Sequence, residues 1–157
     1  MKALLLGDIC PTEENFQLYG EAKTEEIFTD ALPIMQSADF VAVNLECAIT
    51  EHDKAIAKFG PPLKAPFGTA KVLKEAGVTL AGISNNHVFD FGKIGAMDTL
   101  KALSDAGVDT TGFGDNYYDS RRNYVFEKDG QKICVIAVCE HEYSYALEDR
   151  MGSRPFD

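Results

Sequence analysis

The sequence predicts an α/β fold built on a mixed, largely parallel sheet with flanking helices. Short apolar runs alternate with amphipathic stretches along most of the 157 residues, a pattern typical of strand–helix–strand units. Two similar segments, KVLKEAGVTLAGIS and KALSDAGVDTTGFG, each run from a helix through a glycine into a strand. Because two copies are fewer than a repeat array needs, we interpret them as recurring α/β units in one domain over residues 1–157.

Three apolar runs in the first part of the chain are predicted strands. They lie at residues 2–6, 40–45 and 78–83. The segment 50–66 between the second and third runs is rich in Lys, Gly and Pro, which predicts a loop. Strands separated in this way by helices and loops are expected to pair in parallel.

Helical spacing of apolar residues predicts helices at three places. The first covers residues 25–36, where Pro33 should kink or shorten it. The second and third cover residues 68–76 and 95–106, and each is followed directly by a glycine. Glycine favours the left-handed conformation that commonly ends a helix, so these two ends are well defined by the sequence.

A hairpin is predicted near residue 130. Residues 124–127 and 132–138 have strand character, and Lys128-Asp129-Gly130 between them contains the Asp-Gly pair typical of a tight turn. Since a hairpin is antiparallel, we expect the sheet to become mixed at this point.

Charge and hydropathy exclude several classes of protein. The net charge is −10 at pH 7 and the isoelectric point is about 4.7, which argues against binding to nucleic acids or to anionic membrane surfaces. The apolar run at residues 3–6 is too short for a signal peptide, and no segment approaches the roughly 20 apolar residues that span a bilayer. We therefore expect no membrane insertion and a cytoplasmic location.

The cysteines are predicted to be reduced thiols. Cys10, Cys47, Cys134 and Cys139 form no CxxC pair, and a spacing of five should place the last two on opposite faces of a strand. Cys10 and Cys47 each lie within two residues of a candidate metal ligand described below. Between thiolate ligands and small buried hydrophobic residues, we favour the second interpretation.

Polar side chains follow three of the predicted strands, where open α/β sheets carry their ligand chemistry. Asp8 follows the first strand, Asn44 and Glu46 stand at the end of the second, and Asn85-Asn86-His87 follow the third. Carboxylate, amide and imidazole groups suit manganese, magnesium, iron or zinc. These residues therefore predict a site for divalent metal at this edge of the sheet.

Each of these residues also has a plain structural interpretation. Asp8 could stabilise a turn after Gly7, Glu46 could be an ion-paired carboxylate, and Asn85 and Asn86 could cap the turn that follows them. His87 could be a structural histidine. The sequence leaves these alternatives open for each residue taken alone.

The order of three motifs resembles a known family. The motifs are GD at Gly7-Asp8, NLE at Asn44 to Glu46, and NNH followed by Asp90 and Gly92. They resemble the bacterial capsule synthesis proteins of the poly-gamma-glutamate type, a branch of the calcineurin-like metallophosphoesterases. The resemblance implies that the chain is the N-terminal half of a four-layer α/β/β/α sandwich, a single partial domain.

The resemblance also implies roles for individual residues. Asp8, Glu46 and Asn86 would hold two divalent ions (Mn, Fe, Zn or Mg), with Glu46 bridging them, and His87 would act as a general acid. Asn44, Asn85 and His141 are predicted to contact an anionic small-molecule or polymer substrate. His141 belongs to the run Glu140-His141-Glu142, whose adjacent side chains cannot all point at one ion from a regular element.

The family pattern contains further histidines that this sequence does not supply. We therefore expect a second half, a partner chain or a homo-oligomer to complete the site. The predicted function is a metal-dependent, phosphoesterase-like hydrolase associated with capsule or poly-gamma-glutamate synthesis. The alternatives are a non-catalytic binding or assembly protein with the same fold, and an unrelated α/β domain of flavodoxin-like topology.

Overall fold

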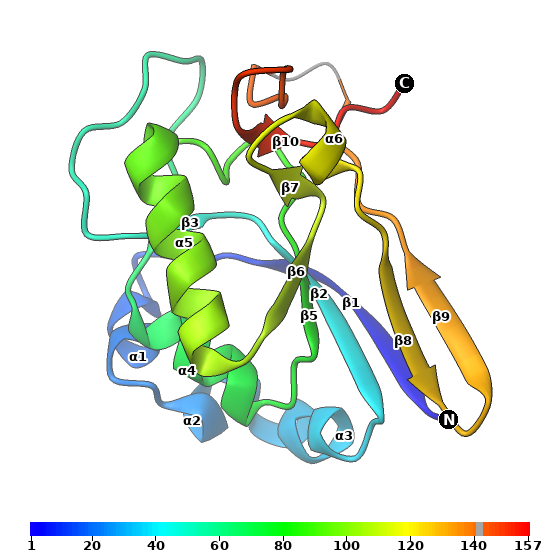
Figure 1. The fold of residues 1–157 in the computed structure, drawn as a ribbon. Helices are drawn as coiled ribbons and strands as arrows, with labels where there is room; N and C mark the ends of the chain where they lie inside the picture. The colour runs from blue at the N-terminus through cyan, green and yellow to red at the C-terminus, as the bar shows by residue number, and fades with distance from the viewer. Residues whose placement is uncertain (141–142) are drawn as a thin grey trace.

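A parallel sheet forms the centre of the fold in the computed structural model, which describes residues 1–140 and 143–157. In this part of the chain the sheet has four strands (Figure 1). They are, in order across the sheet, β1 (Ala3–Ile9), β2 (Phe40–Leu45), β5 (Leu80–Gly82) and β6 (Asp109–Thr111). Because all four run in one direction, their carboxyl ends share one edge of the sheet.

The apolar composition of β2 explains its central place. Its residues Phe40, Val41 and Leu45 are fully buried, as expected for a strand of a parallel sheet that is covered on both faces. The register pairs Asp8 of β1 with Asn44 of β2, and Asn44 with Gly82 of β5. This register sets two of the candidate site residues directly beside one another.

Helices connect the parallel strands and cover one face of the sheet. The connections between successive parallel strands are right-handed, so connections that advance in one direction across the sheet all lie on the same face. In agreement with this, α1 and α2 both contact α4. The connecting elements are α1 (Phe16–Gly20), α2 (Thr24–Phe28), η1 (Thr29–Ala31), α3 (Leu32–Gln36), α4 (Gly68–Glu75) and α5 (Gly92–Ala106).

The helix predicted over residues 25–36 is wrong as a single element. The chain forms α2, η1 and α3 there instead, with Thr29 at a φ of 44° and Pro33 in the first turn of α3. A proline has no N–H to donate, so it fits a first turn and ends any helix before it. Helix α5 ends at residue 106 as predicted, and α4 ends at Glu75, one residue earlier than predicted. The glycines after them, Gly77 and Gly107, adopt φ values of 86° and 73°.

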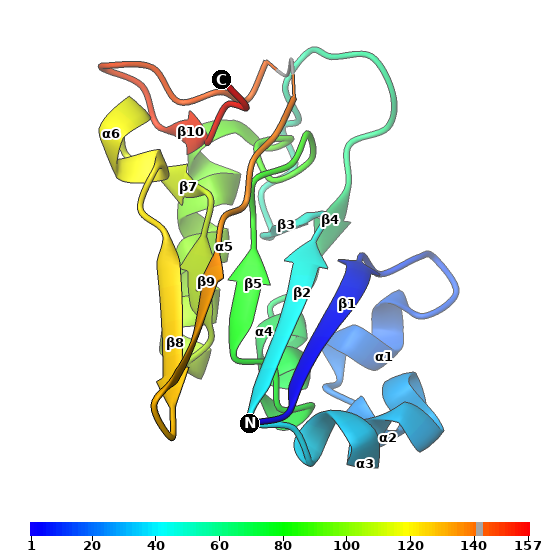
Figure 2. The ribbon, with the colours of Figure 1, turned by 90° about the vertical axis from the view of Figure 1, so that its right-hand side faces the viewer.

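The predicted hairpin is present but does not join the central sheet. Strands β8 (Tyr124–Lys128) and β9 (Gln131–Val135) pair antiparallel as a separate sheet, with β9 ending three residues earlier than expected. The ring of Phe126 stacks on Phe40 with centroids 5.0 Å apart. The hairpin therefore covers the face of the sheet opposite α4 and α5 (Figure 2).

Short elements bring two distant segments to the carboxyl edge of the sheet. Strand β3 (Ala48–Ile49) pairs with β4 (Lys64–Ala65), which closes the loop between them, and β7 (Phe113–Gly114) pairs with β10 (Gly152–Ser153). Helix α6 (Tyr117–Ser120) follows β7 and is capped by the Asn116 side chain. The sequence did not predict these elements, because strands of two residues carry no periodic pattern.

The predicted fold class is confirmed: the protein is α/β, with a largely parallel central sheet and flanking helices. The flavodoxin-like alternative does not fit, since that topology places β1 inside the sheet and here β1 is an edge strand. None of the helices within residues 1–140 and 143–157 has the length and apolar character needed to cross a membrane.

Candidate metal and acid–base site

Three polar side chains at the ends of β1 and β2 form one hydrogen-bonded group. The amide nitrogen of Asn44 donates to Asp8 Oδ1 at 2.8 Å and also to Glu46 Oε2. The parallel register places Asn44 opposite Asp8. Glu46 directly follows β2, and its backbone N–H still donates to Ile9 O at 3.0 Å. Two carboxylates thus converge on one amide group, with Asp8 exposed and Glu46 half-buried.

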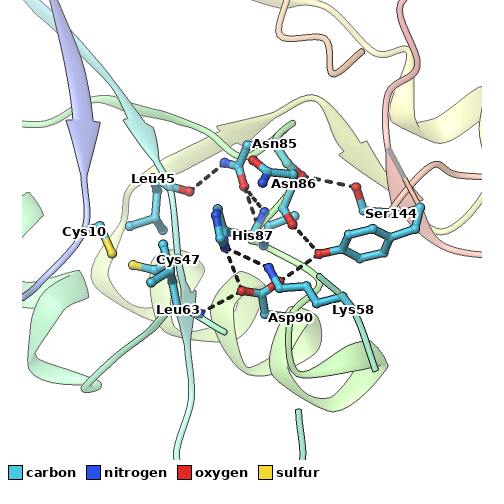
Figure 3. Close-up of polar contacts among 12 residues, drawn as sticks. Cys10, Leu45, Cys47, Lys58, Leu63, Asn85, Asn86, His87, Asp90 and Ser144 are labelled. Carbon is cyan, nitrogen blue, oxygen red and sulfur yellow. Dashed lines mark hydrogen bonds and ion pairs between the residues drawn. The ribbon is translucent and has the colours of Figure 1, made fainter. Parts of the chain in front are cut away.

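Asn85 connects this group to the loop after β5. Its Nδ2 donates to Asn44 Oδ1 at 3.2 Å and to Leu45 O at 2.9 Å (Figure 3). Its Oδ1 accepts the backbone N–H groups of His87 and Val88 at 3.0 and 2.9 Å. The Asn85 side chain therefore fixes the turn that carries His87, and its role as a substrate contact stays a prediction.

His87 belongs to a buried charged cluster that also contains Lys58, Asp90 and Tyr143. Its Nδ1 lies 2.8 Å from Asp90 Oδ2, and Lys58 Nζ lies 2.5 Å from Asp90 Oδ1. The hydroxyl of Tyr143 donates to Asp90 Oδ1 at 2.8 Å, and the N–H of Leu63 donates to Asp90 Oδ2 at 2.7 Å (Figure 3). The Asp90 side chain is 0% exposed and that of Lys58 is 5% exposed, so this ion pair is shielded from water.

The contacts of His87 fix which ring nitrogen carries the proton. Nδ1 lies near both the carboxylate of Asp90 and, at 3.0 Å, the ammonium of Lys58, which is only a donor. An Nδ1–H directed at Asp90 donates a hydrogen bond to the carboxylate, whereas an Nδ1 lone pair would point at its negative charge. We therefore assign the proton of the neutral ring to Nδ1, which leaves Nε2 as the nitrogen available to a ligand.

Asn86 lies in the chain between Asn85, which is bonded to the strand-end group, and His87, which belongs to the charged cluster. Its carbonyl oxygen lies within hydrogen-bond distance of the Tyr143 hydroxyl, whose one proton it shares with Asp90 Oδ1, and this ties the backbone of the loop to the C-terminal segment. Its half-buried side chain forms no hydrogen bond within residues 1–140 and 143–157. An amide oxygen without a protein donor is suited to serve as a ligand.

Electrostatics distinguish Glu46 from its neighbours. Burial raises the pKa of Glu46 above its ordinary value of 4.5, and the negative charge of Asp8 adds to this. The hydrogen bond from Asn44 and the nearby His87 lower the same pKa and only partly offset burial. The strand-end group therefore carries negative charge that a bound cation would stabilise.

Two thiols lie beside Glu46. Cys10 follows β1 and Cys47 follows Glu46, and their side chains interact with each other. This interaction lowers the pKa of Cys10 and, together with burial, raises the pKa of Cys47. Tyr19 of α1 is buried near both sulfurs, and burial raises its pKa.

The donor set suits a hard divalent cation in part. Asp8 and Glu46 supply carboxylate oxygens and Asn86 supplies an amide oxygen, which are the groups that magnesium and manganese prefer. In the part of the chain that the structure describes, no three carboxylate, imidazole or thiol groups converge on one point. The described residues thus fit one side of a cation site.

The structure brings most of the predicted residues to one place. Asp8, Asn44, Glu46 and Asn85 are linked by hydrogen bonds, and His87 is held by the same turn. His141 lies outside the described residues.

Three residues of the site carried no predicted role: Lys58, Asp90 and Tyr143. Asp90 stood in the third motif, but nothing in the pattern marked it as the partner of His87. Lys58 lies in a loop 29 residues before His87, so only the tertiary structure shows their contact.

Comparisons with known proteins agree with the order of the motifs. The model of a family described as bacterial capsule synthesis protein PGA_cap matches residues 2–155. A capsule biosynthesis protein CapA from Bacillus anthracis is 32% identical over 140 residues, which cover 87% of this chain and 34% of that protein. A PGA biosynthesis protein CapA from Bacillus subtilis is 28% identical over 147 residues, covering 89% of this chain and 37% of that protein.

A more distant relative has a related name. A "probable polyglutamine synthesis accessory protein" from Mycobacterium tuberculosis is 27% identical over 127 residues, covering 80% of this chain and 33% of that protein. The chain thus spans about a third of the length of these relatives. Because the family match extends over nearly the whole chain, the chain belongs to the bacterial capsule synthesis protein family.

Proposed function

We propose that the chain carries part of the active site of a metal-dependent, phosphoesterase-like hydrolase that works in capsule or poly-gamma-glutamate synthesis. One observation carries the proposal: the amide of Asn44 joins the carboxylates of Asp8 and Glu46 beside a histidine that a buried aspartate orients. Carboxylates at the ends of adjacent strands are placed to hold a cation. An imidazole in their vicinity is placed to move a proton.

Asp8, Glu46 and Asn86 would hold the divalent ions, which we propose to be two. When bound, the ions would supply Lewis-acid chemistry and neutralise charge on the reacting group. Glu46 binds a cation only as a carboxylate, and its raised pKa means that protons compete at a higher pH than for an ordinary glutamate. Further ligands would come from another part of a longer chain or from a second copy.

His87 would act at the leaving group. Its Nδ1–H is held by Asp90, so Nε2 donates a proton when the ring is charged and accepts one when it is neutral. The carboxylate of Asp90 and the ammonium of Lys58 form an ion pair, and both lie against Nδ1 of His87. The pair of opposite charges therefore orients His87 without adding a net charge to its surroundings.

The names of the relatives support the proposed pathway. Two are named for capsule or PGA biosynthesis and one for polyglutamine synthesis. We propose for this chain an anionic substrate, either a phosphate ester or a bond in such a polymer. The net charge of −10 gives no general attraction for an anion, so bound cations would have to provide it locally.

Metal titration tests the proposal. Isothermal calorimetry of the metal-free chain with manganese should give site-specific binding that Asp8→Ala and Glu46→Ala each weaken at least tenfold. Asp105→Ala is the matched control, because it removes an exposed carboxylate of α5 that pairs with Lys101 on the same helix. Equal binding by all four proteins would mean diffuse attraction to an acidic surface and would contradict the site.

Activity separates the hydrolase from the non-catalytic alternative. With manganese bound, the chain should hydrolyse para-nitrophenyl phosphate, and His87→Asn should reduce kcat more than KM because His87 is proposed to act on the leaving group. Manganese binding without hydrolysis, alone or with the remaining part of a longer chain, would favour a binding or assembly protein with the same fold.

A further inference from the structure

The two thiols beside the candidate ligands form a close pair. Cys10 is half-buried and Cys47 is 0% exposed, and the two side chains interact with each other. Figure 3 shows the two sulfurs pointing toward one another from the ends of adjacent strands. The Cys47 thiol also lies 3.8 Å from Ile9 O, the carbonyl oxygen of the residue before Cys10. The pair therefore has a defined arrangement in the folded chain.

The backbone geometry at this point suits a disulfide. Adjacent strands lie about 4.8 Å apart, and a disulfide needs Cα atoms about 4.4–6.8 Å apart. The ladder between β1 and β2 ends just before the cysteines, since Ile9 pairs with Leu45 and the Glu46 N–H bonds to Ile9 O at 3.0 Å. Bond formation therefore requires the sulfurs to approach, but it does not require the strands to separate.

We propose that Cys10 and Cys47 form a reversible disulfide when the folded chain meets a small-molecule disulfide. The thiolate of Cys10 attacks one sulfur of that molecule, whose S–S bond breaks and releases one thiol. Cys47 then loses its proton, and its thiolate attacks Cys10 Sγ. The mixed S–S bond on Cys10 breaks, and the second thiol leaves after taking up that proton. Two protein thiols are oxidised to one disulfide, and the small disulfide is reduced to two thiols.

The difference in exposure sets this order of events. A small molecule reaches Cys10, which lies at the surface end of β1, before it reaches Cys47, which is packed in the core. The second step needs no entry of solvent, since the attacking thiol is already in contact with its target. Cys134, which is exposed on β9, has no such neighbour, because it faces Val125 across the hairpin.

The disulfide would act on the site of the proposed function, on which this part of the inference rests. Cys10 lies two residues after Asp8, and Cys47 directly follows Glu46. A disulfide holds its sulfurs about 2.05 Å apart, closer than any non-bonded contact, so the side chains of Cys10 and Cys47 must rearrange beside Asp8 and Glu46. Metal sites tolerate ligand shifts of only about 0.2 Å, so oxidation should weaken cation binding.

Mass spectrometry tests the disulfide directly. The folded chain is incubated with oxidised glutathione, blocked with iodoacetamide and digested, and the Cys10–Cys47 linkage is quantified. We expect the linkage as the main product, its loss with dithiothreitol, and the same yield in Cys134→Ser. A chain that carries glutathione on Cys10 while Cys47 stays free to alkylate would overturn the proposal, as would linkage only in urea.

Two variants and a titration complete the test. Cys10→Ser and Cys47→Ala should each abolish the linkage, and Cys10→Ser changes only a half-buried thiol and so guards against a folding defect in the other. Manganese affinity should fall at least tenfold on oxidation of the native chain and stay unchanged on treatment of Cys10→Ser. Equal affinity of the reduced and oxidised chains would overturn the effect on the site. Binding by neither form would refute the proposed function while the disulfide stands.

Discussion

Two groups of charged side chains lie next to each other at the carboxyl edge of the sheet, and they differ in how far their negative charge is neutralised. The strand-end group of Asp8, Asn44 and Glu46 holds two carboxylates with a single neutral amide between them. The cluster around Asp90 surrounds one carboxylate with an ammonium, a hydroxyl, a backbone N–H and an imidazole. The first group has an excess of negative charge, and the second has none.

This difference indicates what each group is for. A buried carboxylate with four donors is rigid, and rigidity is what a histidine needs to be presented in one orientation. A pair of carboxylates that shares one amide leaves oxygen lone pairs for a cation, above all at Glu46, whose partial burial disfavours its charge. The cluster around Asp90 is thus structural support, and the strand-end group is the part that we expect to bind a ligand.

Removal of Asp90 should have the largest effect. Asp90→Ala leaves the ammonium of Lys58 buried without a counter-ion and removes the acceptor of the Leu63 N–H and the Tyr143 hydroxyl. We expect the free energy of unfolding to fall by about 3–5 kcal/mol, the usual cost of breaking a buried ion pair. Urea denaturation measures it, with the exposed Asp105→Ala as the control. A loss no larger than that of the control would show that the cluster is not buried in solution.

Removal of Lys58 should have a smaller effect of the same kind. In Lys58→Met the carboxylate of Asp90 keeps three donors, from Leu63, Tyr143 and His87. The cost should therefore lie at the lower end of the range for a broken buried pair, about 3 kcal/mol. Urea denaturation of Lys58→Met beside Asp90→Ala checks the order. If Lys58→Met were the less stable variant, the donors around Asp90 would not compensate as the structure suggests.

Glu46→Gln should have the smallest effect on stability, and it should stabilise the chain where Asp90→Ala and Lys58→Met destabilise it. The pKa of Glu46 is raised above 4.5, so between pH 4.5 and the raised pKa the folded state holds a proton on Glu46 that the unfolded state has lost. The contribution of this group to stability is present at low pH and is lost as pH rises from 4.5 through the raised pKa. Glu46→Gln should remove this loss and leave the metal-free chain as stable or more stable at neutral pH.

A series of urea titrations from about pH 4 to about pH 7 measures the slope of stability against pH. The native chain should show a fall over this range that the variant lacks. Asp98→Asn, a change on α5 of a carboxylate bonded to Thr50 Oγ1, serves as the control with a different environment. Parallel curves for the native chain and Glu46→Gln would contradict the raised pKa.

The sequence predicted the sheet better than the elements around it. Strand β2 was predicted to the residue because a continuous apolar run leaves little choice of boundary. The helix at residues 25–36 failed because helical spacing continues through Pro33 and Thr29, while the backbone does not. The two-residue strands β3 and β4 depend on pairing with each other, which no local pattern encodes.

The candidate site was likewise predicted in one part and missed in another. The sequence placed Asp8, Asn44 and Glu46 together because the carboxyl ends of adjacent parallel strands must meet. It gave no role to Lys58, which reaches the site only through the path of a long loop. It also favoured reading Cys10 and Cys47 as separate buried hydrophobic residues. Their proximity depends on the pairing of β1 with β2 just before them, which is a tertiary property.

The ties between the His87 loop and the C-terminal segment have a consequence for folding. The carbonyl of Asn85 accepts the hydroxyls of Ser144 and Ser153, and Tyr143 reaches Asp90. These contacts span 53 to 68 residues, so they close only after most of the chain has left the ribosome. The parallel strands β1, β2 and β5 are complete before then. The loop of residues 85–90 should therefore become rigid in a late and separate step, which hydrogen exchange during refolding would resolve as slow protection of these residues.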